Sequence, residues 1–320
     1  MSVTEINQTP PEEPITIPSD RDGVAYLYGH PLLNSLSPPL HQTVYNALGL
    51  NWTQIPLSSV SGPSETYPPP LHTSNPKFVG SSVTMPHKVA IMPYLDDLTE
   101  HARQAGACNT IFMRDDPTTG QRQYVGTNTD CDGIREALTQ NAPDPSRFRG
   151  RPALIIGGGG TARTAIYVMR RWLGSSRIYI VNRDAAEVAA ILEEDRRRNP
   201  DYNAQAPLIP VTDPAEAARL ESPRGYRLWL SWVLLPMRTS RRVSSWRCAT
   251  TPHPGLRLLT WLLPGGWKVI LGSEALIWQG LEQARLWTGK DIIGTPGLVQ
   301  EVKDLVAKTI AERASAKSSL

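Results

Sequence analysis

Several features that would indicate particular protein classes are scarce in this 320-residue chain. The three cysteines, Cys108, Cys131 and Cys248, form no C-x-x-C pair and are odd in number, which argues against disulfides and zinc and suits a reducing, cytoplasmic setting. No run of 18 apolar residues occurs, so we expect no membrane span. The net charge of +3 is too small to indicate nucleic-acid binding. These absences leave a globular protein of two domains, with the proline-rich residues 1–20 as a flexible tail.

Lysine is also scarce, because only seven of the 33 basic residues are lysine and none lies between Lys88 and Lys268. Lys88 ends the stretch GSSVTMPHK (80–88). A desolvated ammonium can lose its proton, whereas a guanidinium cannot. An isolated Lys88 therefore suggests a group that transfers a proton. The alternative is a solvated residue on a helix that begins at Pro86, where proline suits the first helical position.

Strand and helix patterns alternate along the first part of the chain. We expect strands at 24–28, 52–56, 78–83, 107–113 and 123–126, and helices at 38–48 and from Pro86 onward. This alternation predicts a mainly parallel α/β sheet. Two further helical patterns, at 273–287 and 296–314, close the chain.

A second α/β unit follows a helix at 131–141 and a short linker. The strand RPALII (151–156) runs into GGGGTAR, then a helix, then the strand RIYIVNR (177–183). Such a βαβ unit with glycines at its first turn is typical of dinucleotide-binding folds. The glycines let backbone N–H groups approach a pyrophosphate at the positive end of the helix. The alternative is a tight strand–helix turn that binds no ligand.

The second strand of this unit ends in Asn182, Arg183 and Asp184, where such folds contact the adenosine ribose. Arg183 favours the 2′-phosphate of NADP. Asp184 leaves NAD open, because an acidic residue at this place favours a free 2′-hydroxyl. Asp184 is also a good helix-capping residue.

The motif GTNTDCDGI (126–134) has two interpretations when it is taken alone. Asp130 either caps the helix that follows or belongs to a site at the end of the preceding strand. Ser35 and Ser37 in NSLSPPLH are ambiguous in the same way, since they also suit a helix start.

One segment has an unusual composition, because residues 222–273 contain no Asp or Glu but five of the nine Trp and eight Arg or Lys. The segment has no clear period of two or 3.6 residues. A compensated shift of reading frame would explain this composition, and genuine divergence is the alternative. Sequencing the transcript distinguishes them, because an unbroken frame that encodes the same residues eliminates the frame shift.

In their order along the chain, the motifs resemble the shikimate/quinate dehydrogenase family from about Val24 to Gly289. They are GHPLLNSLSPPLH, GSSVTMPHK, GACNTIF, GTNTDCDG, GGGGTAR, VNR and WQGLEQARLWTG. The resemblance implies an N-terminal α/β substrate-binding domain (21–130) and a Rossmann-like NAD(P)-binding domain (131–273), irregular at 222–266. C-terminal helices (274–320) would return to the first domain.

The resemblance also implies a role for each matching residue. Lys88 and Asp130 would form the catalytic pair, in which Lys88 takes the proton of a secondary alcohol and Asp130 orients the ammonium. Ser35 and Ser37 would hydrogen-bond the carboxylate of the ring. The ring hydroxyls would be bound by Thr84, Asn109 and Gln279. The cofactor would be bound by Gly157, Gly159, Gly160, Thr161, Ala162, Asn182, Arg183 and Gly272.

The implied reaction is the NADP-dependent interconversion of shikimate and 3-dehydroshikimate, with NAD as the alternative cofactor. A quinate dehydrogenase and a non-catalytic sensor of such ring acids are the alternative functions. The chain departs from the family pattern at Asn34 (usually His), Ser82 (usually Asn in bacterial members) and Thr127 (usually Asp). The irregular segment also lacks the cofactor-domain motifs of the family, which puts nicotinamide placement in doubt for this chain.

Overall fold

The computed structural model describes residues 18–59, 75–142, 144–221 and 272–318, except for a few side chains within these ranges. Most of the expected tail at 1–20 and the whole irregular segment at 222–266 therefore lie outside the described residues.

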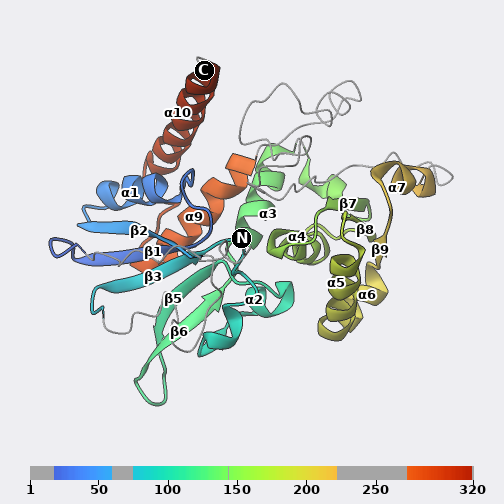
Figure 1. The fold of residues 1–320 in the computed structure, drawn as a ribbon, viewed down its shortest axis with the longest axis horizontal. Coiled ribbons are helices and arrows are strands. Elements are labelled where there is room, and N and C mark those ends of the chain that lie inside the picture. Colours follow the sequence, from blue (N-terminus) through green and yellow to red (C-terminus); the bar gives the residue numbers. More distant parts are fainter. Residues whose placement is uncertain (1–17, 60–74, 143, 222–271, 319–320) are drawn as a thin grey trace, which may run out of the picture.

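The first part of the chain forms a six-stranded mixed sheet (Figure 1). Its strands are β1 (Gly23–Gly29), β2 (Trp52–Ser58), β3 (Phe78–Val83), β4 (Asp97–Leu98), β5 (Thr110–Asp115) and β6 (Arg122–Thr127), in the order β2-β1-β3-β5-β6-β4. β1 pairs in parallel with β2 and β3, and β4 pairs in parallel with β6. β5 is antiparallel to both of its neighbours. The prediction of a mainly parallel α/β sheet is confirmed.

Two long helices from the end of the chain pack against the first part of the chain. They are α9 (Gly272–Thr288) and α10 (Leu298–Ser318), which lie beside α1 (Ser37–Ala47) in Figure 1. Leu40 and Val44 of α1 share one buried cluster with Ile277 and Leu281 of α9 and Val302 of α10. The C-terminal helices therefore return to the first sheet, as the sequence predicted.

A second sheet of three parallel strands follows in the order β7-β8-β9. Its strands are β7 (Pro152–Ile156), β8 (Arg177–Val181) and β9 (Leu208–Pro210). The accompanying helices are α4 (Gly160–Arg171), α5 (Ala185–Arg198), α6 (Pro200–Gln205) and α7 (Pro214–Glu221), and a 3-10 turn, η2 (Pro145–Phe148), precedes β7.

The helix α3 (Asp130–Asn141) connects the two sheets and lies between α9 and α4 in Figure 1. Its residues Ile134 and Leu138 are buried together with Ile166 of α4, Ile155 of β7 and Ile180 of β8. The short helix α2 (Glu100–Ala105) also reaches this cluster through its last residue.

The helix that the sequence predicted from Pro86 does not form. Turns lead instead to a single 3-10 turn, η1 (Met92–Tyr94). The carbonyl oxygen of Lys88 accepts a hydrogen bond from the backbone N–H of Cys108 at 2.7 Å, where a helix would have it accept from Met92. Met92 N–H bonds to Val89 instead. The prediction was wrong because a contact from the segment just before β5 takes the place of a local helical hydrogen bond.

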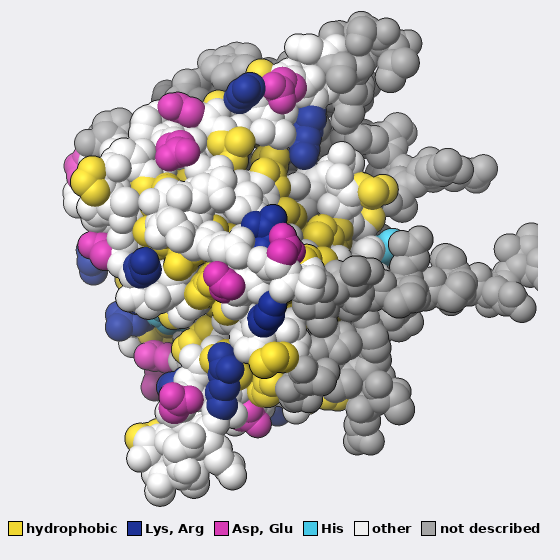
Figure 2. All heavy atoms as spheres, turned by 90° about the vertical axis from the view of Figure 1, so that its left-hand side faces the viewer, with side chains coloured by type: hydrophobic (Ala, Val, Ile, Leu, Met, Phe, Trp, Pro, Cys, Tyr) yellow, Lys and Arg dark blue, Asp and Glu magenta, His cyan; other side chains and the backbone are white. Residues whose placement is uncertain are grey.

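The surface and the helices give two further observations. On the face drawn in Figure 2, basic and acidic side chains are interspersed rather than gathered by sign. Within the part of the chain that the structure describes, no helix has the length and apolar character that a membrane span needs.

Candidate active site

Lys88 and Asp130 come together beyond the carboxyl ends of strands β3 and β6 of the six-stranded sheet. Lys88 lies in the turn after β3, and Asp130 is the first residue of α3. Lys88 Nζ donates to Asp130 Oδ2, and each side chain is 15% exposed. An ion pair that is mostly shielded but still reachable from solvent can exchange a proton with a bound alcohol. The geometry therefore allows the chemistry expected of this pair.

Asn109 fixes the other oxygen of the Asp130 carboxylate. The amide oxygen of Asn109 accepts from the backbone N–H of Thr129 at 2.7 Å, which sets the orientation of the amide. Its nitrogen can then donate to Asp130 Oδ1 at 2.9 Å and to Gln279 Oε1 at 3.2 Å. The structure thus brings three of the predicted site residues into one network with Lys88.

Asn128 joins the Lys88–Asp130 pair to the second sheet. Its amide nitrogen donates to the carbonyl oxygen of Ala107 at 2.8 Å and to Thr164 Oγ1 on α4 at 2.9 Å. Its amide oxygen accepts from the backbone N–H of Asp130 at 3.2 Å. Asn128 is fully buried. It therefore holds the start of α3 against the helix that carries the glycine turn.

Ser35 and Ser37 lie at the start of α1, where Ser37 N–H donates to Ser35 Oγ at 3.2 Å. Ser37 Oγ donates to Gln54 Oε1 at 2.8 Å, and Gln54 Nε2 donates to Ser82 Oγ at 2.9 Å. Ser82 Oγ donates in turn to Gln283 Oε1 at 2.8 Å. The two serines therefore belong to a buried series of hydrogen bonds.

Sequence reasoning missed Gln54 and Gln283. Gln283 follows Gln279 by four residues on one helix, so the two share a face, and this spacing was a usable signal. Gln54 shows no comparable local signal, since its partners come from strands and helices far along the chain.

Thr84 is the remaining residue that was expected to bind the substrate, and it directly follows β3. Its backbone N–H donates to the carbonyl oxygen of Tyr28 at 2.7 Å, and its side chain is half-buried. This position is four residues before Lys88, on the same connection.

The three departures from the family pattern have internal partners. Ser82 is 4% exposed and bonds to two glutamines. Thr127 Oγ1 accepts from Thr99 Oγ1 at 2.7 Å, and the carbonyl oxygen of Asn34 accepts from Arg313 Nη1 at 2.9 Å. Side-chain hydrogen bonds therefore accommodate Ser82 and Thr127, whereas the bond at Asn34 involves only its backbone.

The glycine turn lies between β7 and α4, beside Lys88. Gly157 has a φ of 127°, which favours glycine. A Cβ on Gly159 would meet nothing within 4 Å, so the backbone of this turn faces open space. A Cβ on Gly160 would lie 3.2 Å from Lys88 Cβ. Backbone N–H groups at the start of α4 can hold a phosphate here, directly next to Lys88.

The other predicted cofactor residues lie in α4, after β8 and at the start of α9. Thr161 follows Gly160 in α4, whereas Ala162 is 4% exposed and packs in the core, so only its backbone faces the turn. Asn182 and Arg183 follow β8, and Gly272 is the first residue of α9.

Asp184 caps α5, with its carboxylate accepting from Ala186 N–H at 2.9 Å. Glu187, which sequence reasoning missed, places its carboxylate against the turn, since a Cβ on Gly158 would lie 2.6 Å from Glu187 Oε2. In the sequence, its position three residues after Asp184 and close to the end of β8 was the feature that could have indicated Glu187.

Neither of the described cysteines is suited to nucleophilic chemistry. Burial raises the pKa of the Cys108 thiol to about 12, and it also raises the pKa of Cys131. A thiol with such a pKa is protonated at neutral pH. The cysteines therefore offer no thiolate for chemistry at this site.

Comparisons with known proteins agree with this geometry. The family model for the shikimate dehydrogenase substrate binding domain matches residues 27–111. A quinate dehydrogenase of Emericella nidulans is 61% identical over 96% of this chain and 100% of its own length. The pentafunctional AROM polypeptide of Schizosaccharomyces japonicus is 31% identical over 82% of this chain, which spans 17% of that polypeptide.

The fold also matches a solved structure that contains ligands. Shikimate 5-dehydrogenase from Thermus thermophilus, in complex with NADP(H) and shikimate, has a TM-score of 0.58 and 27% identity. The match covers 88% of this chain and 99% of that one.

Proposed function

Because this chain belongs to the shikimate/quinate dehydrogenase family, we propose that it is an NAD(P)-dependent oxidoreductase that oxidises a ring hydroxyl of quinate. The observation that carries the activity is the Lys88–Asp130 pair, held by Asn109 beside the glycine turn. Quinate is favoured as substrate by the 61% identity to a full-length quinate dehydrogenase. Shikimate, which is bound in solved relatives of lower identity, is the second candidate.

The proposed mechanism assigns one task to each polar group. When bound, the oxidised dinucleotide supplies the acceptor for the hydride of the alcohol carbon. Lys88 Nζ, in its neutral form, removes the hydroxyl proton of the same carbon, and the ring ketone results. Asp130 keeps Lys88 pointed at that hydroxyl, and Asn109 keeps Asp130 in place. In the reverse direction Lys88 returns the proton.

The residues of the second sheet fit a dinucleotide. The open backbone of Gly159 and the N-terminus of α4 suit the pyrophosphate, and the end of β8 suits the adenosine ribose. Arg183 favours the 2′-phosphate of NADP, as the sequence predicted. The carboxylate of Glu187 beside Gly158 instead favours a free 2′-hydroxyl, so we propose NAD as the preferred dinucleotide.

A spectrophotometric assay at the reduced-nicotinamide band tests the function and the cofactor. We expect quinate-dependent reduction of NAD at a higher kcat/KM than with shikimate or with NADP. Glu187→Gln should move the cofactor preference toward NADP, and Glu193→Gln on the exposed part of α5 is a matched control. If neither acid is turned over with either dinucleotide, the protein is not this enzyme, and the alternative of a non-catalytic sensor of ring acids is favoured.

Lys88→Ala tests the catalytic assignment. We expect kcat to fall at least about a hundredfold with the fold intact, because a positioned acid–base group contributes that much or more. Lys88→Arg keeps the positive charge but cannot release a proton, so its kcat should fall as far. Circular dichroism and thermal melting check the fold of both variants. Near-normal turnover in either variant would refute the role of Lys88.

A further inference from the structure

We propose that Asn128 is a positioning residue that holds the glycine turn of the second sheet in a fixed place relative to the Lys88–Asp130 pair. Its buried amide links three segments, namely the segment before β5, the start of α3 and the first turn of α4. The proposal rests on the proposed function and adds that the two halves of the site react together only when this amide holds them. Because Asn128 is 0% exposed, it places other groups and does not itself contact a ligand.

The orientation of the Asn128 amide is fixed by two backbone groups. The carbonyl oxygen of Ala107, 2.8 Å from the amide nitrogen, can only accept. The backbone N–H of Asp130, 3.2 Å from the amide oxygen, can only donate. Exchanging the two amide atoms would place acceptor against acceptor and donor against donor. The amide therefore makes these bonds in one orientation only.

The bond to Ala107 reaches Lys88 through the next residue along the chain. Cys108 N–H donates to the carbonyl oxygen of Lys88 at 2.7 Å. Ala107 and Cys108 are both fully buried, so this segment is enclosed by the rest of the protein. One end of the Asn128 amide thus secures the segment that holds the backbone of Lys88. The other end secures the backbone of Asp130.

The same amide nitrogen also donates to the second sheet. It lies 2.9 Å from Thr164 Oγ1 on α4. The Thr164 hydroxyl gives its own proton to the carbonyl oxygen of Gly160 at 2.9 Å, so toward Asn128 it can only accept. Gly160 belongs to the glycine turn, and a Cβ on it would lie 3.2 Å from Lys88 Cβ. A continuous series of hydrogen bonds therefore joins the turn to the backbone on both sides of the ion pair.

This series of bonds fixes the distance between the turn and the ion pair. In the proposed reaction a hydride and a proton leave the same alcohol group, so the groups that receive them must be placed relative to each other. A misplacement of about 1 Å costs about a hundredfold in rate. Thr164 is the best position for a test, because it is fully buried and its side chain does not face a ligand.

The test compares Thr164→Val with Thr164→Ser in the full chain. Valine has the shape of threonine but offers no acceptor, so it leaves a buried Asn128 N–H without a partner. We expect kcat with quinate to fall about tenfold, while KM for quinate and for the dinucleotide stays within about twofold, because each ligand still binds its own half of the site. Serine keeps the hydroxyl and should return kcat close to the wild-type value. Thr139→Val is a matched control, since Thr139 Oγ1 donates to the carbonyl oxygen of Arg135 within α3.

Hydrogen exchange on the ligand-free protein gives a readout that does not depend on turnover. The backbone amides of Cys108 and Asp130 should exchange faster in Thr164→Val than in the wild type and in Thr139→Val, because the side chain that secures their segments is loosened. Thermal melting checks that each variant is folded. If Thr164→Val does not fold, Thr164→Ala removes the same acceptor and should show the same loss of kcat and the same faster exchange.

Three results would overturn the proposal. They are an unchanged kcat in Thr164→Val, an equal loss of kcat in Thr164→Ser, and a raised KM for the dinucleotide at unchanged kcat. Unchanged exchange at Cys108 and Asp130 would overturn it as well. Failure of the proposed function would look different, since the wild-type protein would then oxidise no ring acid while the difference in exchange remained.

Discussion

Buried polar side chains are stabilised in different ways around the two sheets. Beside the six-stranded sheet they are mainly neutral amides and hydroxyls, and backbone groups fix the orientation of Asn109 and Gln283. Beside the three-stranded sheet the core is largely apolar, and its buried charged groups, Arg170 and Asp195, form an ion pair. A neutral network specifies which atom donates and which accepts, so it fixes the orientation of each amide. An ion pair fixes helices in place without imposing such a direction.

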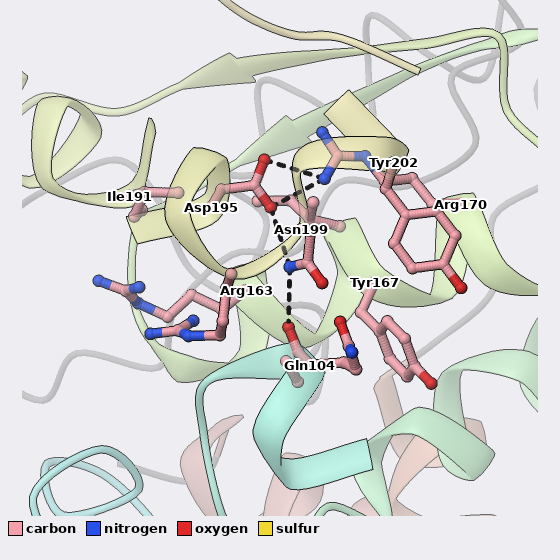
Figure 3. A pocket seen from close by; sticks show the side chains of 11 residues that line it. Gln104, Arg163, Tyr167, Arg170, Ile191, Asp195, Asn199 and Tyr202 are labelled. Atoms are coloured by element: carbon pink, nitrogen blue, oxygen red, sulfur yellow. Dashed lines mark hydrogen bonds and ion pairs between the residues drawn. The ribbon is translucent and has the colours of Figure 1, made fainter. Parts of the chain in front are cut away.

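The ion pair connects three helices of the second sheet. Arg170 Nη1 on α4 donates to both carboxylate oxygens of Asp195 on α5, at 2.8 and 2.9 Å. The Asp195 carboxylate also accepts from Asn199 at 3.4 Å (Figure 3). Asn203 of α6 donates to it as well, at 2.9 Å. Arg170 and Asp195 have side chains only 2% and 9% exposed. Loss of one partner would therefore leave a buried charge without compensation.

The largest expected effect is that of Asp195→Ala on stability. We expect the free energy of unfolding to fall by about 3 to 5 kcal/mol, because Arg170 is left buried and unpaired. Chemical denaturation followed by circular dichroism measures the change.

Two control variants sharpen this test. The double variant Arg170→Met with Asp195→Leu should recover most of the stability, since no charge then remains buried. Arg285→Ala, which removes an exposed pair with Glu282, should cost less than about 1 kcal/mol. A loss after Asp195→Ala no larger than that after Arg285→Ala would contradict the role of the ion pair.

His41 gives the corresponding prediction for the six-stranded sheet. Burial lowers the pKa of His41 from 6.5 to about 4, so the folded protein keeps this side chain neutral where the unfolded chain binds a proton. The stabilisation is complete above pH 6.5 and is lost as the pH falls toward 4. From the size of the shift, we expect a loss of about 3 kcal/mol between pH 7 and pH 4.

Urea unfolding across this pH range, on the wild type and on His41→Gln, checks this expectation. The variant should lose most of the histidine contribution to the pH dependence, while His30→Gln, at an exposed position, should keep it. The same slope in His41→Gln and in the wild type would show that other groups cause the acid sensitivity.

The sequence predicted features that depend on local chemistry. The glycine turn and the cap at Asp184 each follow from residues close together in the chain. The order of the motifs also indicated which residues form the candidate site. The structure brings four of them together, namely Lys88, Asp130, Asn109 and Gln279.

Features that depend on distant partners were not predicted. The expected helix at Pro86 fails because Cys108, twenty residues later, binds the carbonyl oxygen of Lys88. The network through Gln54 and Gln283 joins residues more than 200 positions apart, as in the bond from Ser82 to Gln283. No local pattern specifies such pairings, so this network required the structure.

The smallest expected effect belongs to Gly159→Thr, which tests whether the second sheet binds through its backbone. Gly159 has φ −74° and ψ −174°, a conformation open to any residue, and it caps α4. Threonine is itself a good capping residue, so stability should hold. Its side chain would fill the open space above the turn, and we expect KM for the dinucleotide to rise about tenfold, equivalent to about 1.4 kcal/mol.

Steady-state kinetics with each substrate varied in turn separate the two halves of the site. KM for quinate should stay close to the wild-type value in Gly159→Thr, because the proposed ring-acid site is formed by side chains around the six-stranded sheet. Gly159→Ala, with a smaller side chain, should show a smaller rise in the dinucleotide KM. If Gly159→Thr changed KM for quinate and not for the dinucleotide, the open space at the turn would belong to the ring acid. The division between side-chain recognition on one sheet and backbone recognition on the other would then be wrong.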